Sequence, residues 1–165
     1  MLRSSVLSVL AALFVMVGCA SQKPANSPDS LTSDAGANSG LSLELRGDSD
    51  SGTAGGLQTV YFAFDSSTLG TDAQDSLKAN AEFLKTNTTV DVQVEGHCDE
   101  RGGIQYNLAL GERRAKAVRD YLVALGVAKA RISVVSYGKE KPAAFGHDEA
   151  AWGKNRRGNF VVTAK

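Results

Sequence analysis

The chain has 165 residues, of which 42% are hydrophobic and 22% are charged, so it is long enough for one ordinary globular domain. Lys and Arg together number 18, as do Asp and Glu, and the formal net charge is therefore zero. No nucleic-acid partner is expected, because such binding requires a basic excess gathered on one face.

The first 18 residues have the layout of a secretory signal. A single cation, Arg3, precedes a mostly apolar run from Val6 to Val17 that ends in small residues. The run is roughly a dozen residues long, whereas a transmembrane helix needs ~20 apolar residues. Residues 1–18 are therefore predicted to be a signal peptide.

The sequence VMVGC at residues 15–19 resembles the bacterial lipobox, in which the cysteine is acylated and becomes the mature N-terminus. Each buried acyl CH₂ contributes about 0.8 kcal/mol, so two or three chains would anchor a protein durably in a bilayer. The residue after the cysteine is Ala20. In proteobacterial lipoproteins an Asp at this position favours retention in the inner membrane, so Ala20 is compatible with the outer membrane. The alternative is ordinary signal cleavage, with Cys19 incidental.

Residues 19–56 are predicted to form a lipid-anchored flexible linker. From Ala20 to about Gly56 the sequence is rich in Ser, Gly, Ala, Asn and Asp and has almost no aromatic or β-branched residues. Such a composition cannot bury enough surface to offset its ordering entropy. The alternation of Leu41, Leu43 and Leu45 is interpreted as part of the linker, and the alternative is a short strand or a partner motif.

Residues 57–165 are predicted to fold. Four segments have the composition and alternation typical of strands, namely residues 59–64, 90–95, 132–137 and 159–163. In the first of them, Val60, Phe62 and Phe64 share one face. The second leads directly into Gly96.

Helices are predicted between these strands. Thr71 and Gln74 form a capping box that starts the first helix, which ends near Asn87. The second helix covers residues 105–125, and its predicted buried stripe is Ala115, Val118, Leu122 and Leu125. Asp148 is predicted to cap a short turn of helix that runs through Trp152. Strands alternating with helices imply an α/β (α+β) sandwich, in which two main helices cover one side of the sheet.

The charged loop GHCDERGG at residues 96–103 joins the second strand to the second helix. Asp99 lies just past the strand, and its carboxylate is expected to be exposed. On the helix, Asn107, Leu110 and Arg114 are three and four residues apart, so they share one stripe. Asp99 meets Arg114 only if the loop folds back along the helix.

A carboxylate and a guanidinium on neighbouring elements suit a ligand that carries an ammonium and a carboxylate on one carbon. Asp99 would bind the ammonium, and Arg114 would bind the carboxylate. The alternative is that the two residues pair with each other or with neighbouring charges on a solvated surface. This is the commoner outcome for a charged loop. The neighbouring charges are Glu100, Arg101 and Glu112.

A metal or general-base site is also conceivable, because His97 and Asp99 alternate and Glu95 lies behind them. It is disfavoured, since the other histidine, His147, is distant and the sequence has neither an H-E-x-x-H pair nor a nucleophile elbow. His97 is interpreted as a structural residue whose ring bonds nearby backbone. If Cys19 is acylated, Cys98 has no disulfide partner and is either buried or a free thiol.

Five motifs, taken in order, resemble the OmpA-like peptidoglycan-binding domain family: VYFAFD at 60–65, VEGHCDERG at 94–102, YNLALGERRA at 106–115, VSYG at 135–138 and NRR at 155–157. The resemblance covers nearly all of residues 57–165, and the lipobox and linker agree with it. Within the family, the chain most resembles the lipid-anchored members.

The resemblance implies a βαβαββ domain, with a mixed four-stranded sheet packed against helices, that holds the diaminopimelate residue of peptidoglycan stem peptides. In the family, the Asp of H-x-D-E-R-G and the second Arg of R-R-A contact that head group, which here are Asp99 and Arg114. The residues that would frame the pocket are Phe64, Asp65, Asn107 and Leu110, with Asn155 and Arg156 as supports. Cys98 and Gly103 stand where the family often has Thr.

The implied function is not enzymatic and needs no cofactor or metal. An outer-membrane lipoprotein, anchored through Cys19 with its domain in the periplasm, would tether the outer membrane to the cell wall. It would act in a Tol-Pal system, with a TolB-like periplasmic protein as partner, in envelope integrity and cell division. The alternative is a periplasmic wall-remodelling hydrolase.

Overall fold

The computed structural model describes residues 47–164, with side chains over residues 47–163. The predicted signal peptide, Cys19 and most of the predicted linker, including Leu41, Leu43 and Leu45, lie outside the described residues. Within the described range, every helix is too short or too polar to cross a membrane.

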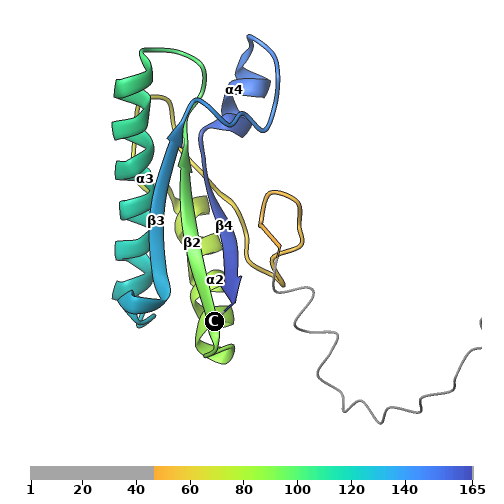
Figure 1. Ribbon diagram of the computed structural model, residues 1–165, viewed down its shortest axis with the longest axis vertical. Coiled ribbons are helices and arrows are strands. Elements are labelled where there is room, and N and C mark those ends of the chain that lie inside the picture. The colour runs from red at the N-terminus through yellow and green to blue at the C-terminus, as the bar shows by residue number, and fades with distance from the viewer. Residues whose placement is uncertain (1–46, 165) are drawn as a thin grey trace, which may run out of the picture. The chain divides into compact units, whose positions relative to one another are not determined.

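A mixed four-stranded sheet organises the described region (Figure 1). Its strands are β1 Val60–Tyr61, β2 Val90–His97, β3 Ile132–Gly138 and β4 Arg157–Ala164. They lie in the order β1-β4-β2-β3, with β2 parallel to β3 and antiparallel to β4, and with β1 antiparallel to β4. The prediction of a mixed four-stranded sheet is confirmed.

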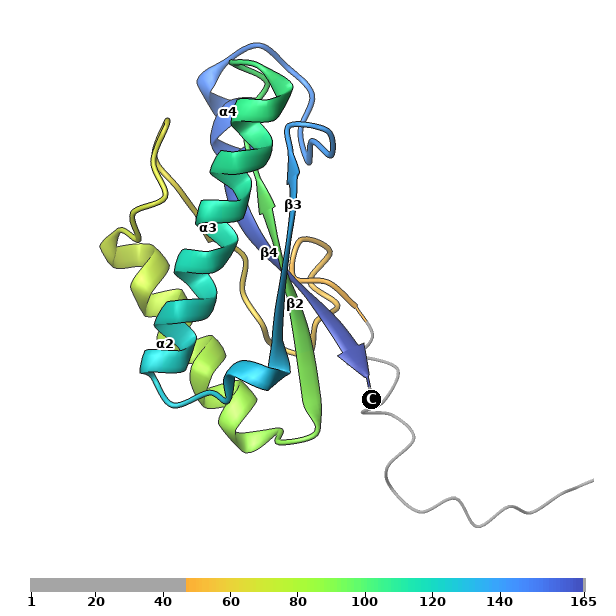
Figure 2. The same cartoon turned by 60° about the vertical axis from the view of Figure 1, so that its left-hand side comes forward.

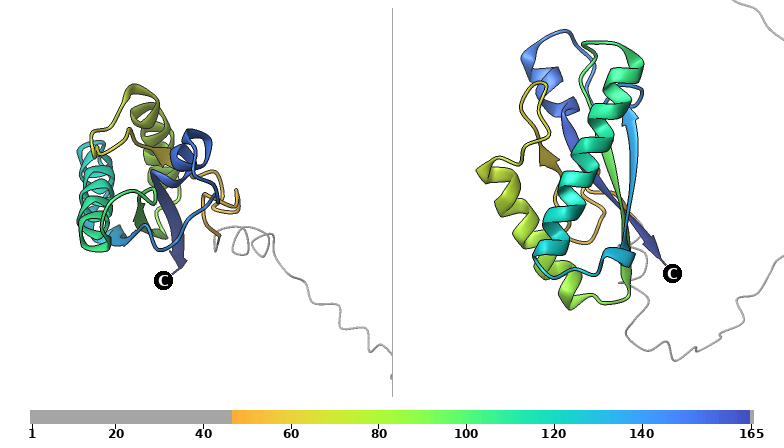
Figure 3. Two further views of the ribbon diagram at one scale, coloured as in Figure 1. Left: turned by 90° about the horizontal axis from the view of Figure 1, so that it is seen from above. Right: turned by 90° about the vertical axis from the view of Figure 1, so that its left-hand side faces the viewer.

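Three α-helices complete the region: α2 Thr71–Thr86, α3 Ile104–Ala124 and α4 Glu149–Asn155, with a short 3₁₀ helix at Lys129–Arg131. Figure 2 and the right panel of Figure 3 show α2 and α3 side by side on one face of the sheet. The short helix α4 lies at the same end of the sheet as the loop that joins β2 to α3. The predicted covering by two main helices is confirmed.

The core lies between the sheet and these two helices. In β2, Val90, Val92 and Val94 alternate with more exposed residues and are buried, as predicted. Phe160 of β4 pairs with Val94 and is fully buried beside it. The helices contribute Leu77, Ala81, Leu84, Ala115, Val118 and Leu122. Burying one large aliphatic side chain contributes about 1.5–3 kcal/mol, so this layer is the main source of stability.

The first strand is shorter than predicted. Pairing with β4 covers only Val60 and Tyr61, and the N–H of Phe62 donates to the carbonyl of Arg156 at 2.9 Å. Phe62 is buried, whereas Phe64 lies beyond β1 and is 58% exposed, so the prediction that Phe64 shares one strand face with Val60 and Phe62 is wrong. The chain leaves the sheet after Phe62 and turns at Asp65, whose φ is +52°.

The helix starts differ from the prediction in one place. The N-cap of α2 is Gly70 and not Thr71, and the Gln74 side chain donates to the carbonyl of Leu69 at 3.0 Å, so the capping box is wrong. The α4 cap is confirmed, because the Asp148 carboxylate accepts the N–H of Ala151 at 2.8 Å.

Residues 48–54 pack against the domain, although the sequence assigned them to the linker. Asp48 pairs antiparallel with Val161, and the Asp50 carboxylate accepts a hydrogen bond from Arg157 Nε at 2.5 Å. Ala54 is 1% exposed and belongs to the core cluster. The packed region therefore begins before Leu57.

Two glycines bring α3 onto the end of β2. A Cβ atom added to Gly96 would lie 1.9 Å from the carbonyl oxygen of Gly111, and one added to Gly111 would lie 2.7 Å from the carbonyl oxygen of Gly96. Only glycine permits so close an approach of two backbones. The contact places the start of α3 beside the loop of residues 98–103.

Candidate functional site

A cavity of about 140 Å³ opens beside the carboxyl end of β2. The turn after β1, the loop between β2 and α3, and α3 itself supply its walls. Its lining residues are Phe64, Asp65, Cys98, Asp99, Arg101, Gly102, Tyr106, Asn107, Leu110 and Arg114. All six residues that the sequence nominated for a binding site therefore lie around one cavity.

Helical spacing places three of these residues. Asn107, Leu110 and Arg114 lie within α3, and all three are buried on the side of the helix that faces the cavity. The Asn107 side chain donates to the carbonyl of Arg101 at 2.8 Å, and this bond folds the loop back along the helix. The fold-back that the sequence left open is thus present.

Asp99 is buried at 4% exposure, so the expectation of an exposed carboxylate is wrong. Its Oδ1 accepts from the backbone N–H of Arg101 at 3.1 Å and from Arg101 Nε at 3.2 Å. Its Oδ2 accepts from Arg101 Nη2 at 2.6 Å and from Arg156 Nη1 at 3.3 Å. Two guanidinium groups thus offset the cost of burying this carboxylate.

These bonds also keep Asp99 ionised. Burial alone would raise the pKa of the Asp99 carboxyl, but the hydrogen bonds from Arg101, and then the bond from Arg156, lower that pKa below its ordinary value. A carboxylate that is ionised at neutral pH is therefore present at the cavity wall.

Arg114 is fully buried and does not pair with Asp99. Its Nε donates to the carbonyl of Ser66 at 2.8 Å, its Nη1 to that of His97 at 2.7 Å, and its Nη2 to that of Ala63 at 3.0 Å. Burial lowers the pKa of this guanidinium. Arg114 therefore holds the turn at residues 63–66 against the end of β2, and each Nη keeps a second N–H, because a guanidinium has five.

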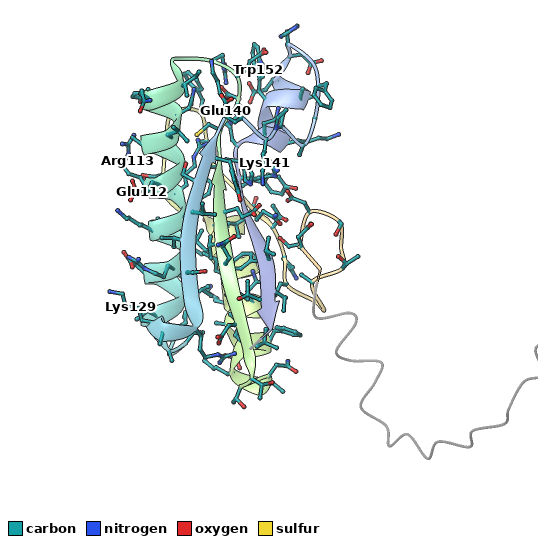
Figure 4. The ribbon with its side chains drawn as sticks, in the orientation of Figure 1. Glu112, Arg113, Lys129, Glu140, Lys141 and Trp152 are labelled. Atoms are coloured by element: carbon teal, nitrogen blue, oxygen red, sulfur yellow. The ribbon has the colours of Figure 1, made fainter. Side chains whose placement is uncertain are left out.

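Arg101 covers Asp99 from the outside. Its guanidinium carbon lies 3.9 Å from the centre of the Phe64 ring and 4.0 Å from the centre of the Trp152 ring, so it is stacked between two aromatic side chains. The sequence treated Arg101 only as a neighbouring charge and did not predict Trp152 near the site. Figure 4 shows Trp152 on α4, at the end of the molecule where β2 passes into α3.

The Glu100 carboxylate holds Trp152 in place and also contacts His147. The indole Nε1–H donates to Glu100 Oε1 at 2.8 Å, and His147 Nδ1 lies 2.7 Å from the same oxygen. Hydrogen bonding to Glu100 raises the pKa of His147 above its ordinary value of 6.5. The loop before α4 is thereby attached to the loop that carries Asp99.

Tyr106 connects the turn after β1 to α3. Its hydroxyl donates a short hydrogen bond to the Asp65 carboxylate. Asp65 has a left-handed backbone, which is uncommon for a residue other than glycine and is found at sites where the surrounding contacts hold the turn. Tyr106 was missed by the sequence reasoning, although it opens the motif that contains Asn107.

Residues 61–156 of the chain match the OmpA family. The chain belongs to the OmpA family. It is 41% identical over 155 residues to the peptidoglycan-associated lipoprotein of Mesorhizobium japonicum, covering 94% of this chain and 89% of that protein. The protein of the same name from Pseudomonas aeruginosa is 46% identical over 155 residues, covering 88% of this chain and 89% of the relative. The predicted resemblance is confirmed.

Solved structures agree with the fold. The crystal structure of the peptidoglycan-associated lipoprotein from Burkholderia pseudomallei has a TM-score of 0.62 and 48% identity, covering 64% of this chain and 89% of that chain. The C-terminal domain of Helicobacter pylori MotB has a TM-score of 0.62 at 22% identity, covering 67% of this chain and 87% of that chain. The second likeness concerns the fold alone.

Cys98 is a buried free thiol. Its Sγ donates to the carbonyl of Asn107 at 3.4 Å, inside the cavity wall. Burial raises the pKa of this thiol, and the nearby charge of Arg114 opposes that shift only in part. Cys98 therefore acts as a small apolar wall residue of this OmpA domain.

His97 is buried. Its ring was predicted to hydrogen-bond nearby backbone, but it contacts the Glu95 side chain instead. Nε2 lies 3.3 Å from Glu95 Oε2, and the ring stacks on Tyr137 with centroids 5.7 Å apart. The hydrogen bond with His97 lowers the pKa of Glu95. Glu95 and His97 thus pair together while Asp99 pairs with arginines, and residues 47–163 contain no group of three or more His, Cys, Asp or Glu that could hold a metal ion.

Proposed function

We propose that this chain binds the diaminopimelate head group of peptidoglycan stem peptides in the cavity beside Asp99, as a binding protein and not as an enzyme. The observation that carries the proposal is the convergence of six nominated residues, from three separate segments, on one small cavity with an ionised carboxylate in its wall. The names of the relatives support peptidoglycan as the partner.

The charges of the cavity fit such a head group. Its ammonium finds the Asp99 carboxylate, and its carboxylate finds guanidinium N–H groups in the same wall. Charge-assisted hydrogen bonds contribute roughly 1.5–3 kcal/mol each, so two or three of them give a modest affinity for one site. The aromatic rings of Phe64 and Tyr106 add apolar contact at the rim.

Modest affinity is sufficient for a tether. We infer that Cys19 is acylated in the outer membrane and that the linker lets the domain reach the wall from the periplasmic side. Many anchored copies then face one continuous polymer, and their effective concentration holds the two layers together. A Tol-Pal system with a TolB-like partner, and a role in envelope integrity and cell division, belong to this proposal.

A wall-remodelling hydrolase is the competing function. A hydrolase would need a carboxylate or histidine able to accept a proton near neutral pH. Asp99 is engaged by two guanidinium groups that lower its pKa, which makes it a weak base. His147, whose pKa is raised, does not line the cavity. The geometry therefore favours binding over hydrolysis.

Calorimetric titration tests the proposal. The full-length chain with Cys19→Ser, which cannot be acylated, is titrated with a stem peptide that contains diaminopimelate and with its lysine analogue. We expect saturable binding of the first peptide and weaker binding of the second, which lacks the side-chain carboxylate. The proposal would be contradicted if neither peptide binds, or if the protein releases wall fragments on incubation with peptidoglycan.

A further inference from the structure

Arg101 occupies the position beside Asp99 where a ligand ammonium would bind. Arg101 contacts both carboxylate oxygens of Asp99, through Nε at 3.2 Å and Nη2 at 2.6 Å. The Arg101 side chain is 31% exposed while that of Asp99 is 5% exposed, so Arg101 lies between the carboxylate and solvent. A ligand that approaches Asp99 therefore meets Arg101 first.

The guanidinium of Arg101, unlike that of Arg114, has its printed hydrogen bonds to a carboxylate and not to backbone carbonyls. The nitrogens of Arg114 each donate to a backbone carbonyl, and moving it would release the turn at residues 63–66. Among the described residues, the guanidinium of Arg101 contacts Asp99 and the faces of two rings, Phe64 and Trp152. Stacking on a ring face tolerates sliding, because it does not fix the direction of the N–H groups.

The charge balance of the cavity indicates what such a movement requires. The charged residues that line it are Asp65, Asp99, Arg101 and Arg114, and their formal charges sum to zero. A ligand with an ammonium alone would add an uncompensated positive charge beside Arg101 and Arg114, and close to Arg156, which also bonds Asp99. A ligand with an ammonium and a carboxylate keeps the sum at zero and gives Arg101 a new partner.

We propose that Arg101 is an internal counter-ion that sets the specificity of the site. The ligand ammonium displaces its guanidinium from Asp99, and the guanidinium then binds the ligand carboxylate while it remains stacked against Phe64 and Trp152. No covalent bond changes, and the step is an exchange of ion-pair partners. The consequence is a preference for an amino-acid head group over a plain ammonium. This inference rests on the proposed function and concerns the same cavity.

Peptide selectivity tests this role. The Cys19→Ser chain and the same chain with Arg101→Gln are titrated with the diaminopimelate peptide and the lysine analogue. We expect the parent protein to prefer the diaminopimelate peptide by roughly tenfold or more, because that peptide makes at least one additional charge-assisted bond. After Arg101→Gln this preference should fall to within about threefold, partly because the lysine peptide gains affinity. Arg119→Gln, which removes an arginine paired with Asp120 outside the cavity, should keep the full preference.

The outcomes separate the two proposals. If the parent chain binds neither peptide, the proposed function fails. If it discriminates between the peptides and Arg101→Gln discriminates equally well, the function stands and the role of Arg101 is wrong.

A second measurement needs no substitution of Arg101. The Nε–H signal of Arg101 is followed by NMR, and the emission of Trp152, the one tryptophan of the chain, is recorded during the titration. We expect both signals to change with the diaminopimelate peptide at the same midpoint. An Arg101 Nε–H signal that stays unchanged at saturation would overturn the exchange.

Discussion

Arg114 Nη1 donates a 2.7 Å hydrogen bond to the carbonyl oxygen of His97, which attaches the middle of α3 to the last residue of β2. Two further bonds from the same guanidinium reach the carbonyls of Ala63 and Ser66. The residue nominated as a ligand contact is therefore also a structural clamp of the cavity. Its substitution will affect stability as well as binding.

Arg114→Ala is expected to lower the free energy of unfolding by about 2 kcal/mol or more. It leaves the buried carbonyl of His97 unpaired, at a cost of roughly 1–3 kcal/mol, and also removes the bonds to the part-buried carbonyls of Ala63 and Ser66. Urea unfolding followed by circular dichroism measures this loss. Arg113→Ala is the matched control, because Arg113 is exposed and points away from the sheet on the outer side of α3 (Figure 4). Equal stability of the two variants would show that Arg114 is not a clamp.

Stability is expected to fall in acid. The pKa values of Asp99 and Glu95 are lowered in the folded state from ordinary values of 3.8 and 4.5. A lowered pKa contributes stability that is present above the unfolded value and is lost as the pH falls through the folded value. The free energy of unfolding should therefore drop below about pH 4. Asp99→Asn should flatten this dependence, and an unchanged pH profile in that variant would contradict the assignment.

His147 is expected to titrate above its ordinary pKa of 6.5, because Glu100 stabilises its protonated form. The contribution of the pair is present below pH 6.5 and is lost as the pH rises through the raised pKa. NMR titration of the imidazole signals gives this value. Glu100→Gln should return the pKa of His147 toward 6.5. An identical His147 titration in both proteins would rule out the pair.

Cys98 is expected to react slowly with a thiol reagent while the chain is folded. Its Sγ is buried, and burial raises its pKa, so both access and the thiolate fraction are reduced. In the Cys19→Ser chain, Cys98 is the one remaining cysteine, and its modification can be followed by absorbance. The rate should rise at least about 100-fold in urea. A fast reaction in buffer would mean that the cavity wall opens readily.

Local patterns predicted much of this molecule. The alternation in β2 identified its buried face, and the spacing of Asn107, Leu110 and Arg114 identified the stripe of α3 that lines the cavity. Both features depend on residues a few positions apart, so the period of the element determines them.

Contacts between distant segments could not be predicted in the same way. Asp99 is buried because Arg156, 57 residues later, joins Arg101 in neutralising it. Arg101 in turn lies between Phe64 and Trp152, which belong to two other segments. The spacing of residues along the chain does not indicate which distant segments come into contact. A charged loop considered alone is therefore predicted to be exposed to solvent.

The most direct test of the central claim is co-sedimentation with isolated peptidoglycan. The Cys19→Ser chain and the same chain with Asp99→Asn, which keeps the shape of the side chain and removes its charge, are incubated with the polymer and centrifuged. We expect the parent chain to sediment with the wall. The Asp99→Asn chain, shown by circular dichroism to be folded at neutral pH, should stay in the supernatant. Equal sedimentation of the two proteins would contradict this expectation.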